Sequence, residues 1–339
     1  MEYNVVEYTK KIVAKHTPLC RYNGEQDFAQ WQNQCKEKLA ELLGMEAFEK
    51  CEPNLQIEYI KDEGDYTDTR FSFQVEEGLY APCHLLTPKN VTGKLPVIIC
   101  LQGHTTGMHM SINKPKYERD VQMLAGCPER AIAVEATKRG YATISLEQRY
   151  MGERGHSEDG TPICCSGDAV ASLLMGRTNV GGRVWDIQRL IDVIETDFPR
   201  LDKDRIGCMG GSGGGTATFY AACLEDRIQY CNPNVAVCTY RDSIVAMHHC
   251  ACNYVPGIAK YFDMGDLGGL VAPRKMVMSN GKEDPIFPIE GAIESAEIIK
   301  KLYKAAGAED NFVFYIGDGG HQAYTGAVMD ILEEMLAEE

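Results

Sequence analysis

The sequence lacks any apolar run close to the roughly 20 residues that a membrane-spanning helix needs. Residues 1–7 also lack a positively charged segment followed by an apolar core, which is the mark of a secretory signal peptide. No internal repeat is visible. These absences argue against a membrane protein, a secreted protein and a repeat array, so we expect a cytoplasmic protein.

Positive charge is also scarce. The chain has 34 Lys and Arg against 49 Asp and Glu, which gives a net charge of −15 at pH 7. A nucleic-acid surface needs clustered Lys and Arg, and acidity of this size also disfavours anionic membranes. We therefore expect a small-molecule substrate rather than a nucleic acid or a membrane. Nothing in the sequence selects between a monomer and a homo-oligomer.

Cysteine, in contrast, is abundant. The fourteen cysteines are scattered, and many lie in apolar runs such as residues 97–101 and 235–239. Such cysteines are typical of buried, reduced thiols in a reducing compartment. The adjacent Cys164 and Cys165 are likewise interpreted as packing rather than as a redox pair.

The order of hydrophobic patterns predicts an α/β fold. Residues 26–43 have helical spacing and end at Gly44, whereas residues 55–86 alternate as antiparallel strands do. After Pro88, short apolar runs alternate with helical patterns, which predicts a mostly parallel sheet flanked by helices. These runs are residues 95–101, 141–146, 205–209, 229–239, 275–279 and 311–316. We expect an N-terminal helical extension over residues 1–54 and one catalytic domain over residues 55–339.

A glycine-rich stretch, residues 205–215, carries the first candidate catalytic residue. It runs from a strand-like segment through Gly-Gly-Ser-Gly-Gly into a helical pattern, which fits the G-x-S-x-G nucleophile elbow with Ser212 as the nucleophile. A Cβ at Gly210 or Gly214 would collide with the adjoining strand or helix. A phosphate-binding loop is the alternative, but no Gly-Lys-Ser/Thr follows.

A serine nucleophile needs a base that a carboxylate orients. Downstream of Ser212, Asp284 lies on a turn after the strand-like run 275–279, and His321 follows the next run at the start of the last helical pattern. Ser, acid and His in this order, each at a strand end, predict a catalytic triad. Glu283 is an adjacent rival for the acid, and Asp318 is a weaker one.

The loop after residues 95–101 begins Gln102-Gly103-His104 and is the candidate for an oxyanion hole. Two backbone N–H groups are needed there, and we predict those of His104 and Gly213. The alternative is that the His104 side chain contacts the substrate. Gln102, which stands where esterase motifs usually have His, is a candidate substrate-binding residue.

Residues 247–254 are the other chemically dense segment. Its His and Cys residues do not have the spacing of paired zinc ligands, so no metal site is predicted. We interpret the segment as lining the substrate pocket, with His248, His249 and Tyr254 as substrate-binding candidates, and ordinary packing is the alternative. Arg149, shortly after the 141–146 run, is predicted to brace the active-site loops through a buried ion pair.

Six of these segments together resemble an α/β-hydrolase of the dienelactone hydrolase and acetyl xylan esterase-like group. They are residues 102–104, 149–152, 182–186, 210–214, 281–284 and 320–321, and the resemblance runs from residue 55 to the C-terminus. It implies a serine esterase without a cofactor, in which Ser212, Asp284 and His321 occupy the triad positions. Dienelactone hydrolase itself uses a Cys nucleophile, and Ser212 therefore favours carboxylic esters over dienelactone.

The expected reaction is hydrolysis of carboxylic esters through an acyl-enzyme. Short acyl esters of carbohydrates or similar small molecules are the first substrate class, and only the resemblance suggests it. A peptidase or amidase would use the same triad and is the alternative. A third hypothesis is a non-catalytic binding protein on a hydrolase fold.

Overall fold

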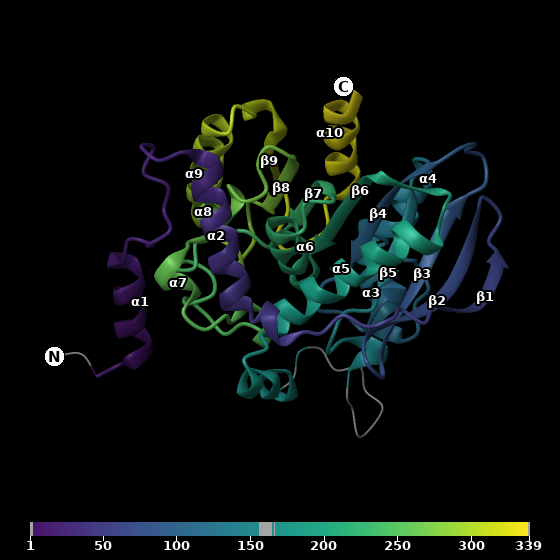
Figure 1. Cartoon of the computed structure of the whole chain (residues 1–339), viewed down its shortest axis with the longest axis horizontal. Coiled ribbons are helices and arrows are strands. Elements are labelled where there is room, and N and C mark those ends of the chain that lie inside the picture. Colours follow the sequence, from purple (N-terminus) through teal and green to yellow (C-terminus); the bar gives the residue numbers. More distant parts are fainter. Residues whose placement is uncertain (1–2, 156–164, 166, 338–339) are drawn as a thin grey trace.

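The computed structural model describes residues 3–155, 165 and 167–337 (Figure 1). One nine-stranded sheet forms its centre, in the order β1-β2-β3-β5-β4-β6-β7-β8-β9. The strands are β1 (Gln56–Asp62), β2 (Tyr66–Glu76), β3 (Leu79–Pro88), β4 (Leu95–Leu101), β5 (Ala142–Leu146), β6 (Leu201–Gly211), β7 (Ile228–Asn234), β8 (Lys275–Gly281) and β9 (Phe312–Gly317).

The α-helices are α1 (Val5–Lys15), α2 (Phe28–Leu43), α3 (Glu118–Gly126), α4 (Ile132–Lys138), α5 (Asn179–Asp197), α6 (Gly213–Leu224), α7 (Ile258–Tyr261), α8 (Met264–Gly268), α9 (Ile289–Ala305) and α10 (Thr325–Ala337). Short 3₁₀ helices are η1 (Met45–Ala47), η2 (Met108–Met110), η3 (Pro128–Arg130), η4 (Gly152–Arg154), η5 (Gly167–Met175), η6 (Ala251–Asn253) and η7 (Glu309–Asn311).

The sheet has an antiparallel edge and a parallel body. Strands β1, β2 and β3 pair antiparallel with one another, and β3 pairs antiparallel with β5. From β5 to β9 every neighbouring pair is parallel, with Ile99 of β4 opposite Ile144 of β5 on one side and Cys208 of β6 on the other. The carboxyl ends of the parallel strands therefore lie along one edge, which is where open α/β sheets bind ligands.

Helices cover both faces of the sheet (Figure 1). Along β4, Val97, Ile99 and Leu101 belong to an apolar cluster shared with α2, α5, α6, α8 and α9. The intervening Ile98 and Cys100 belong to a second cluster, shared with α4 and α10. The strict alternation follows from the two-residue repeat of a strand, and burial on both sides explains why β4 reads as a continuous apolar run.

The predicted fold class is confirmed, and most predicted element boundaries lie within a few residues of the observed ones. The helix predicted over residues 26–43 is α2, and Gly44 ends it in the left-handed region at φ 73°. The predicted strand 229–239 is wrong beyond residue 234, because β7 ends at Asn234 and Val235 turns the chain with φ 45°. The proposed domain boundary at residue 54 stays a prediction, although the buried face of α2 packs into the same cluster as the sheet.

The predicted buried ion pair of Arg149 is confirmed. Its guanidinium contacts Asp186 of α5 at 2.7 Å and Glu76 of β2 at 2.8 Å. Arg154 contacts the second oxygen of Asp186 at 2.6 Å. Burial raises the pKa of Asp186, but the two guanidinium charges outweigh it and hold that pKa below its usual value. These ion pairs connect the loop after β5 to helix α5 and to strand β2 of the antiparallel edge.

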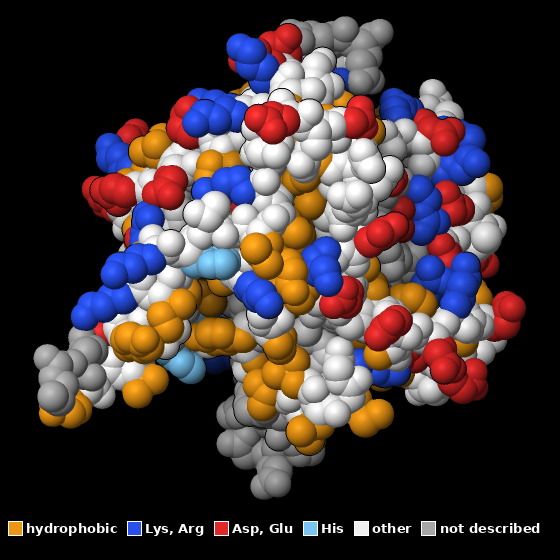
Figure 2. All heavy atoms as spheres, turned by 60° about the vertical axis from the view of Figure 1, so that its left-hand side comes forward, with side chains coloured by type: hydrophobic (Ala, Val, Ile, Leu, Met, Phe, Trp, Pro, Cys, Tyr) orange, Lys and Arg blue, Asp and Glu red, His pale blue; other side chains and the backbone are white. Residues whose placement is uncertain are grey.

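Helix α1 differs from the other α-helices because none of its residues is buried. Beside it lies a groove lined largely by apolar side chains of α1 and of residues 244–259. Figure 2 shows apolar side chains gathered on this face of the molecule. In the described part of the chain, no helix combines the length and the apolar character needed to cross a membrane.

Replacing Leu39 by Ala tests whether α2 belongs to the folded core. Leu39 is fully buried in the cluster that contains the sheet, so we expect the variant to lose about 2–5 kcal/mol of unfolding free energy. Glu37→Ala, at an exposed position on the same helix, is the control and should change it by less than about 0.5 kcal/mol. Chemical denaturation measures both, and equal losses would contradict the assignment.

Candidate active site

Ser212 lies in a strained turn between β6 and α6. Its backbone has φ 53° and ψ −119°, a conformation that residues with a Cβ rarely adopt. The backbone N–H of Ser212 donates to the carbonyl oxygen of Asn234 at 2.9 Å, which ties the turn to the end of β7. The turn places the serine side chain at the carboxyl edge of the sheet.

The glycines beside Ser212 are required by close packing, as the sequence predicted. A Cβ on Gly210 would lie 2.5 Å from the carbonyl carbon of Gly214. A Cβ on Gly214 would overlap the carbonyl oxygen of Leu101, at the end of β4. Strand β4 and helix α6 can therefore meet only where both positions lack a side chain.

His321 and Asp284 lie side by side at the same edge. The Nδ1 atom of His321 is 2.8 Å from Oδ2 of Asp284, whose side chain is fully buried. The other oxygen, Oδ1, accepts the backbone N–H groups of Ile286 at 2.8 Å and Phe287 at 3.1 Å. These hydrogen bonds orient the carboxylate, and the carboxylate in turn orients the imidazole.

The rival acids do not reach the imidazole. Glu283 is exposed, and the side chain of Asp318 is 97% exposed and pairs with Lys282 at 2.8 Å. His321 lies in the loop before α10 rather than at the helix start, because that helix begins only at Thr325. The structure thus brings the predicted His321 and Asp284 together, whereas Glu283 and Asp318 are exposed to solvent.

Phe287 is a site residue that the sequence analysis missed. Its ring stacks on His321 with centroids 5.9 Å apart and an interplanar angle of 12°, and it meets the ring of His249 edge-on at 5.6 Å. Only its position three residues after Asp284 could have pointed to it. The stacking adds a second restraint on the orientation of the imidazole.

The loop after β4 runs directly beside Ser212. A Cβ on Gly103 would lie 3.3 Å from the Cβ of Ser212, and a Cβ on Gly213 would overlap the imidazole ring of His104. Gly213 is also the first residue of α6, where a backbone N–H has no acceptor within the helix. This packing is compatible with the predicted pair of oxyanion donors, the amides of His104 and Gly213, which stay a prediction.

A buried carboxylate, also missed by the sequence analysis, fixes this loop. Glu147 is fully buried at the end of β5 and accepts the side-chain N–H of Gln102 at 2.7 Å and the backbone N–H of Met108 at 3.1 Å. Burial raises the pKa of Glu147 to about 7. Gln102 lines the cavity, but its amide nitrogen is used by Glu147, so its contact with substrate stays a prediction.

Ser212 and His321 line one cavity of about 360 Å³. Its wall contains His248, His249 and Asn253, and Arg130 adds a positive charge. The remaining lining residues are Leu101, Gln102, Gly103, His104, Thr105, Met110, Met123, Ile132, Gly211, Asn234, Val235, Cys250, Ile286, Phe287, Gln322 and Ala323. The cavity combines apolar surface with a few polar groups, which is typical of a small-molecule site.

The segment 247–254 divides between two surfaces. His248 and His249 face the cavity, and the Nε2 atom of His249 is 3.3 Å from the hydroxyl of Ser243. Burial lowers the pKa of His249. Tyr254 instead lies in the groove beside α1, where its hydroxyl accepts the backbone N–H of His249 at 3.2 Å. Its predicted substrate contact would need a substrate that extends out of the cavity.

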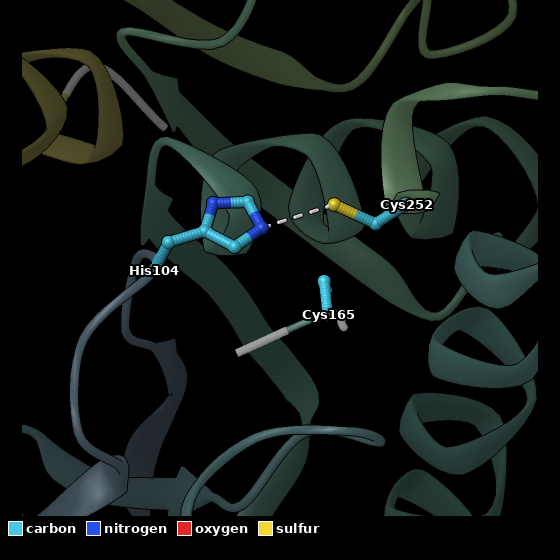
Figure 3. A group of neighbouring side chains, drawn as sticks. All are labelled: His104, Cys165 and Cys252. Carbon is cyan, nitrogen blue, oxygen red and sulfur yellow. Dashed lines mark hydrogen bonds between the residues drawn. The ribbon is translucent and has the colours of Figure 1, made fainter. Parts of the chain in front are cut away.

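One group of side chains in the described part of the chain could hold a metal ion. It consists of His104, Cys165 and Cys252, whose ligand atoms all lie within 4.8 Å of one another (Figure 3). The spacing of residues in the sequence did not reveal this group, because its three members come from three separate segments of the chain. Cys164, which was paired with Cys165 in the sequence analysis, lies outside the described residues.

The sheet order, the strained turn and the placement of His321 define an α/β-hydrolase fold. The chain belongs to the Abhydrolase family, because the sequence model of that family matches residues 3–323. A relative in Bacillus subtilis (strain 168), "Putative hydrolase YtaP", is 26% identical over 248 residues, which cover 71% of this chain and 78% of that protein.

Solved structures show the same fold at low sequence identity. A "putative acetyl xylan esterase" from Bacteroides fragilis NCTC 9343 is 15% identical with a TM-score of 0.82, and the match covers 99% of this chain and 96% of that one. A glucuronoyl esterase from Solibacter usitatus is 16% identical with a TM-score of 0.67, over 94% of this chain and 98% of that one. Acetyl xylan esterase 1 from Thermoanaerobacterium sp. JW/SL YS485 is 16% identical with a TM-score of 0.60, over 96% and 98%.

The buried Glu147 predicts a pH-dependent contribution to stability. Because its pKa is raised from 4.5 to about 7, the folded chain holds a proton that the unfolded chain releases between these pH values. The contribution to the free energy of unfolding is therefore largest below pH 4.5 and is lost as the pH rises toward 7, by at most about 1.4 kcal/mol per pH unit.

Glu147→Gln mimics the protonated carboxyl and removes this dependence. The quantity to follow is the difference in unfolding free energy between the unmodified protein and the variant. We expect this difference to fall by about 2–3 kcal/mol between about pH 5 and about pH 7, and to change little above about pH 7. Denaturant titrations at each pH measure this difference. A difference that does not change with pH would mean that Glu147 is ionised throughout this range.

Proposed function

We propose that this protein is a serine esterase that hydrolyses carboxylic esters through an acyl-enzyme. The observation that carries the proposal is the Asp284–His321 pair, joined at 2.8 Å, whose imidazole lines the same cavity as Ser212. The strained turn at Ser212 supports it, because a nucleophile elbow exposes its serine in this way. Membership of a hydrolase family supports it independently.

In the proposed reaction, His321 takes the proton of Ser212 as the serine oxygen attacks the ester carbonyl. The amides of His104 and Gly213 stabilise the oxyanion of the tetrahedral intermediate. His321 then protonates the leaving alcohol and activates a water that releases the acid from Ser212. The negative charge of Asp284 stabilises the imidazolium in both steps.

Short acyl esters of carbohydrates are the proposed substrates. The cavity is small, at about 360 Å³, and its wall carries polar side chains such as His248, His249 and Asn253 that can bind hydroxyl groups. The names of the structural neighbours, acetyl xylan esterases and a glucuronoyl esterase, support the same class. The reaction needs no cofactor, and the cytoplasmic location expected from the sequence is part of the proposal.

Covalent labelling tests the nucleophile. A fluorophosphonate should modify Ser212 alone, as peptide mass spectrometry would show, and Ser212→Ala should remove the label. The variant should lower kcat toward an aryl acetate by about 10⁴-fold or more without a large change in melting temperature. Labelling at another residue, or full activity of the variant, would refute the proposed nucleophile.

A substrate panel for the unmodified protein should contain acetylated sugars, uronic acid methyl esters, feruloyl and other aryl esters, lactones and aminoacyl amides. Hydrolysis of the esters is the expected result, and Ser212→Ala is the control for background hydrolysis. Activity confined to the amides would favour the peptidase or amidase hypothesis.

Matched amide substitutions test the acid. Asp284→Asn should lower kcat by about 10³–10⁴-fold, because the amide no longer stabilises the imidazolium. Glu283→Gln and Asp318→Asn are the controls, since both side chains are exposed and neither contacts His321, and they should retain activity. A large loss in either control with little loss in Asp284→Asn would reassign the acid.

A further inference from the structure

A cluster of thiols and an imidazole lies beside the cavity, and the proposed reaction uses none of these side chains, only the backbone amide of His104. The Nε2 atom of His104 is 3.2 Å from the Sγ of Cys252 (Figure 3). The Sγ of Cys165 completes the group. His104 comes from the loop after β4, Cys165 precedes α5, and Cys252 lies in η6. Figure 3 shows the ring of His104 pointing toward the sulfur of Cys252, with Cys165 beside them.

We propose that His104, Cys165 and Cys252 form a binding site for a thiophilic divalent cation, with Zn²⁺ as the physiological candidate. Two thiolates and one imidazole are a ligand set that Zn²⁺ uses in proteins. This inference goes beyond the esterase function and does not depend on it.

The distances fit this cation. Zn–S bonds of about 2.3 Å and Zn–N bonds of about 2.0–2.1 Å place the ligand atoms of a tetrahedral ion about 3.6–3.8 Å apart. The ligand atoms of the cluster lie within 4.8 Å of one another, so the widest pairs need to close by at most about 1 Å, and the 3.2 Å pair of His104 and Cys252 needs to open by only about 0.4 Å. A disulfide would need the two sulfurs to approach to about 2.05 Å and would leave the imidazole without a role.

The surroundings supply the donors that metal thiolates use. Arg183 donates an N–H to the Sγ of Cys165 at 2.8 Å, so a guanidinium lies against this sulfur. Asn253 donates to the Sγ of Cys252 at 3.7 Å. Hydrogen bonds of this kind orient metal ligands and tune their basicity.

An entry path is also present. Cys165 and Cys252 are only 7% and 1% exposed, whereas His104, Cys250 and Asn253 line the catalytic cavity. An ion can therefore reach the two buried sulfurs through the cavity. Binding releases the thiol protons to solvent. The metal affinity should therefore fall as the pH is lowered.

Metal titration of the full-length, reduced protein tests the site. We expect one equivalent of Zn²⁺ per chain by calorimetry, and one equivalent of Cd²⁺ with the ultraviolet charge-transfer absorption of Cd–thiolate bonds. Because this absorption is measured on the unmodified protein, it does not depend on any variant folding. No stoichiometric binding, or binding without thiolate absorption, would overturn the proposal.

Two variants locate the ligands. Cys165→Ser and Cys252→Ser should each weaken Zn²⁺ binding by more than the roughly 10–100-fold that loss of an outer hydrogen bond costs. Cys223→Ser is the matched control, because Cys223 is fully buried in α6 outside the cluster, and it should bind Zn²⁺ normally. Unchanged affinity in both ligand variants would overturn the assignment.

Two further measurements separate this proposal from its competitors. Ser212→Ala should bind Zn²⁺ as the unmodified protein does, so a failure of the esterase proposal leaves the metal site standing. Treatment of the metal-free protein with hydrogen peroxide, followed by peptide mapping, tests for a disulfide between Cys165 and Cys252. A disulfide in a protein that binds no Zn²⁺ would make the cluster a redox pair and overturn the metal site.

Discussion

The site depends on how closely helix α6 approaches the end of strand β4. Gly210 and Gly214 leave room for that contact. A Cβ on Gly210 would overlap main-chain atoms of Gly214, and a Cβ on Gly214 would overlap those of Leu101. The serine between them has a strained conformation, with φ 53° at Ser212. The strain is maintained by the packing of a nine-stranded sheet, which the turn alone could not supply.

Two buried carboxylates orient the loops that meet at this turn. Asp284 uses one oxygen for His321 and the other for two backbone N–H groups, so its charge is compensated. Glu147 accepts hydrogen bonds around the loop after β4, and burial raises its pKa to about 7. The first carboxylate orients the proposed base, and the second holds the loop that carries the proposed oxyanion donor.

The sequence predicted those parts of the fold and site that have a local signal. Strand β4 is visible as an apolar run, and Ser212, Asp284 and His321 follow strands in an order that only a few folds use. Phe287 and Glu147 have no such signal, since their roles come from contacts with residues far away in sequence. The end of β7 was also missed, because Val235 is a strand former in a position that requires a turn.

Cysteine illustrates this limit most clearly. Residues 247–254 taken alone lack the spacing of a zinc site, but the fold adds His104 and Cys165 from two other segments. His104 is then shared, because its ring lies against Gly213 while its Nε2 faces the sulfur of Cys252. An ion held by that ring would restrain the same loop whose amide is proposed to stabilise the oxyanion. The two proposals therefore share one residue, and metal binding at its ring would affect the position of its amide.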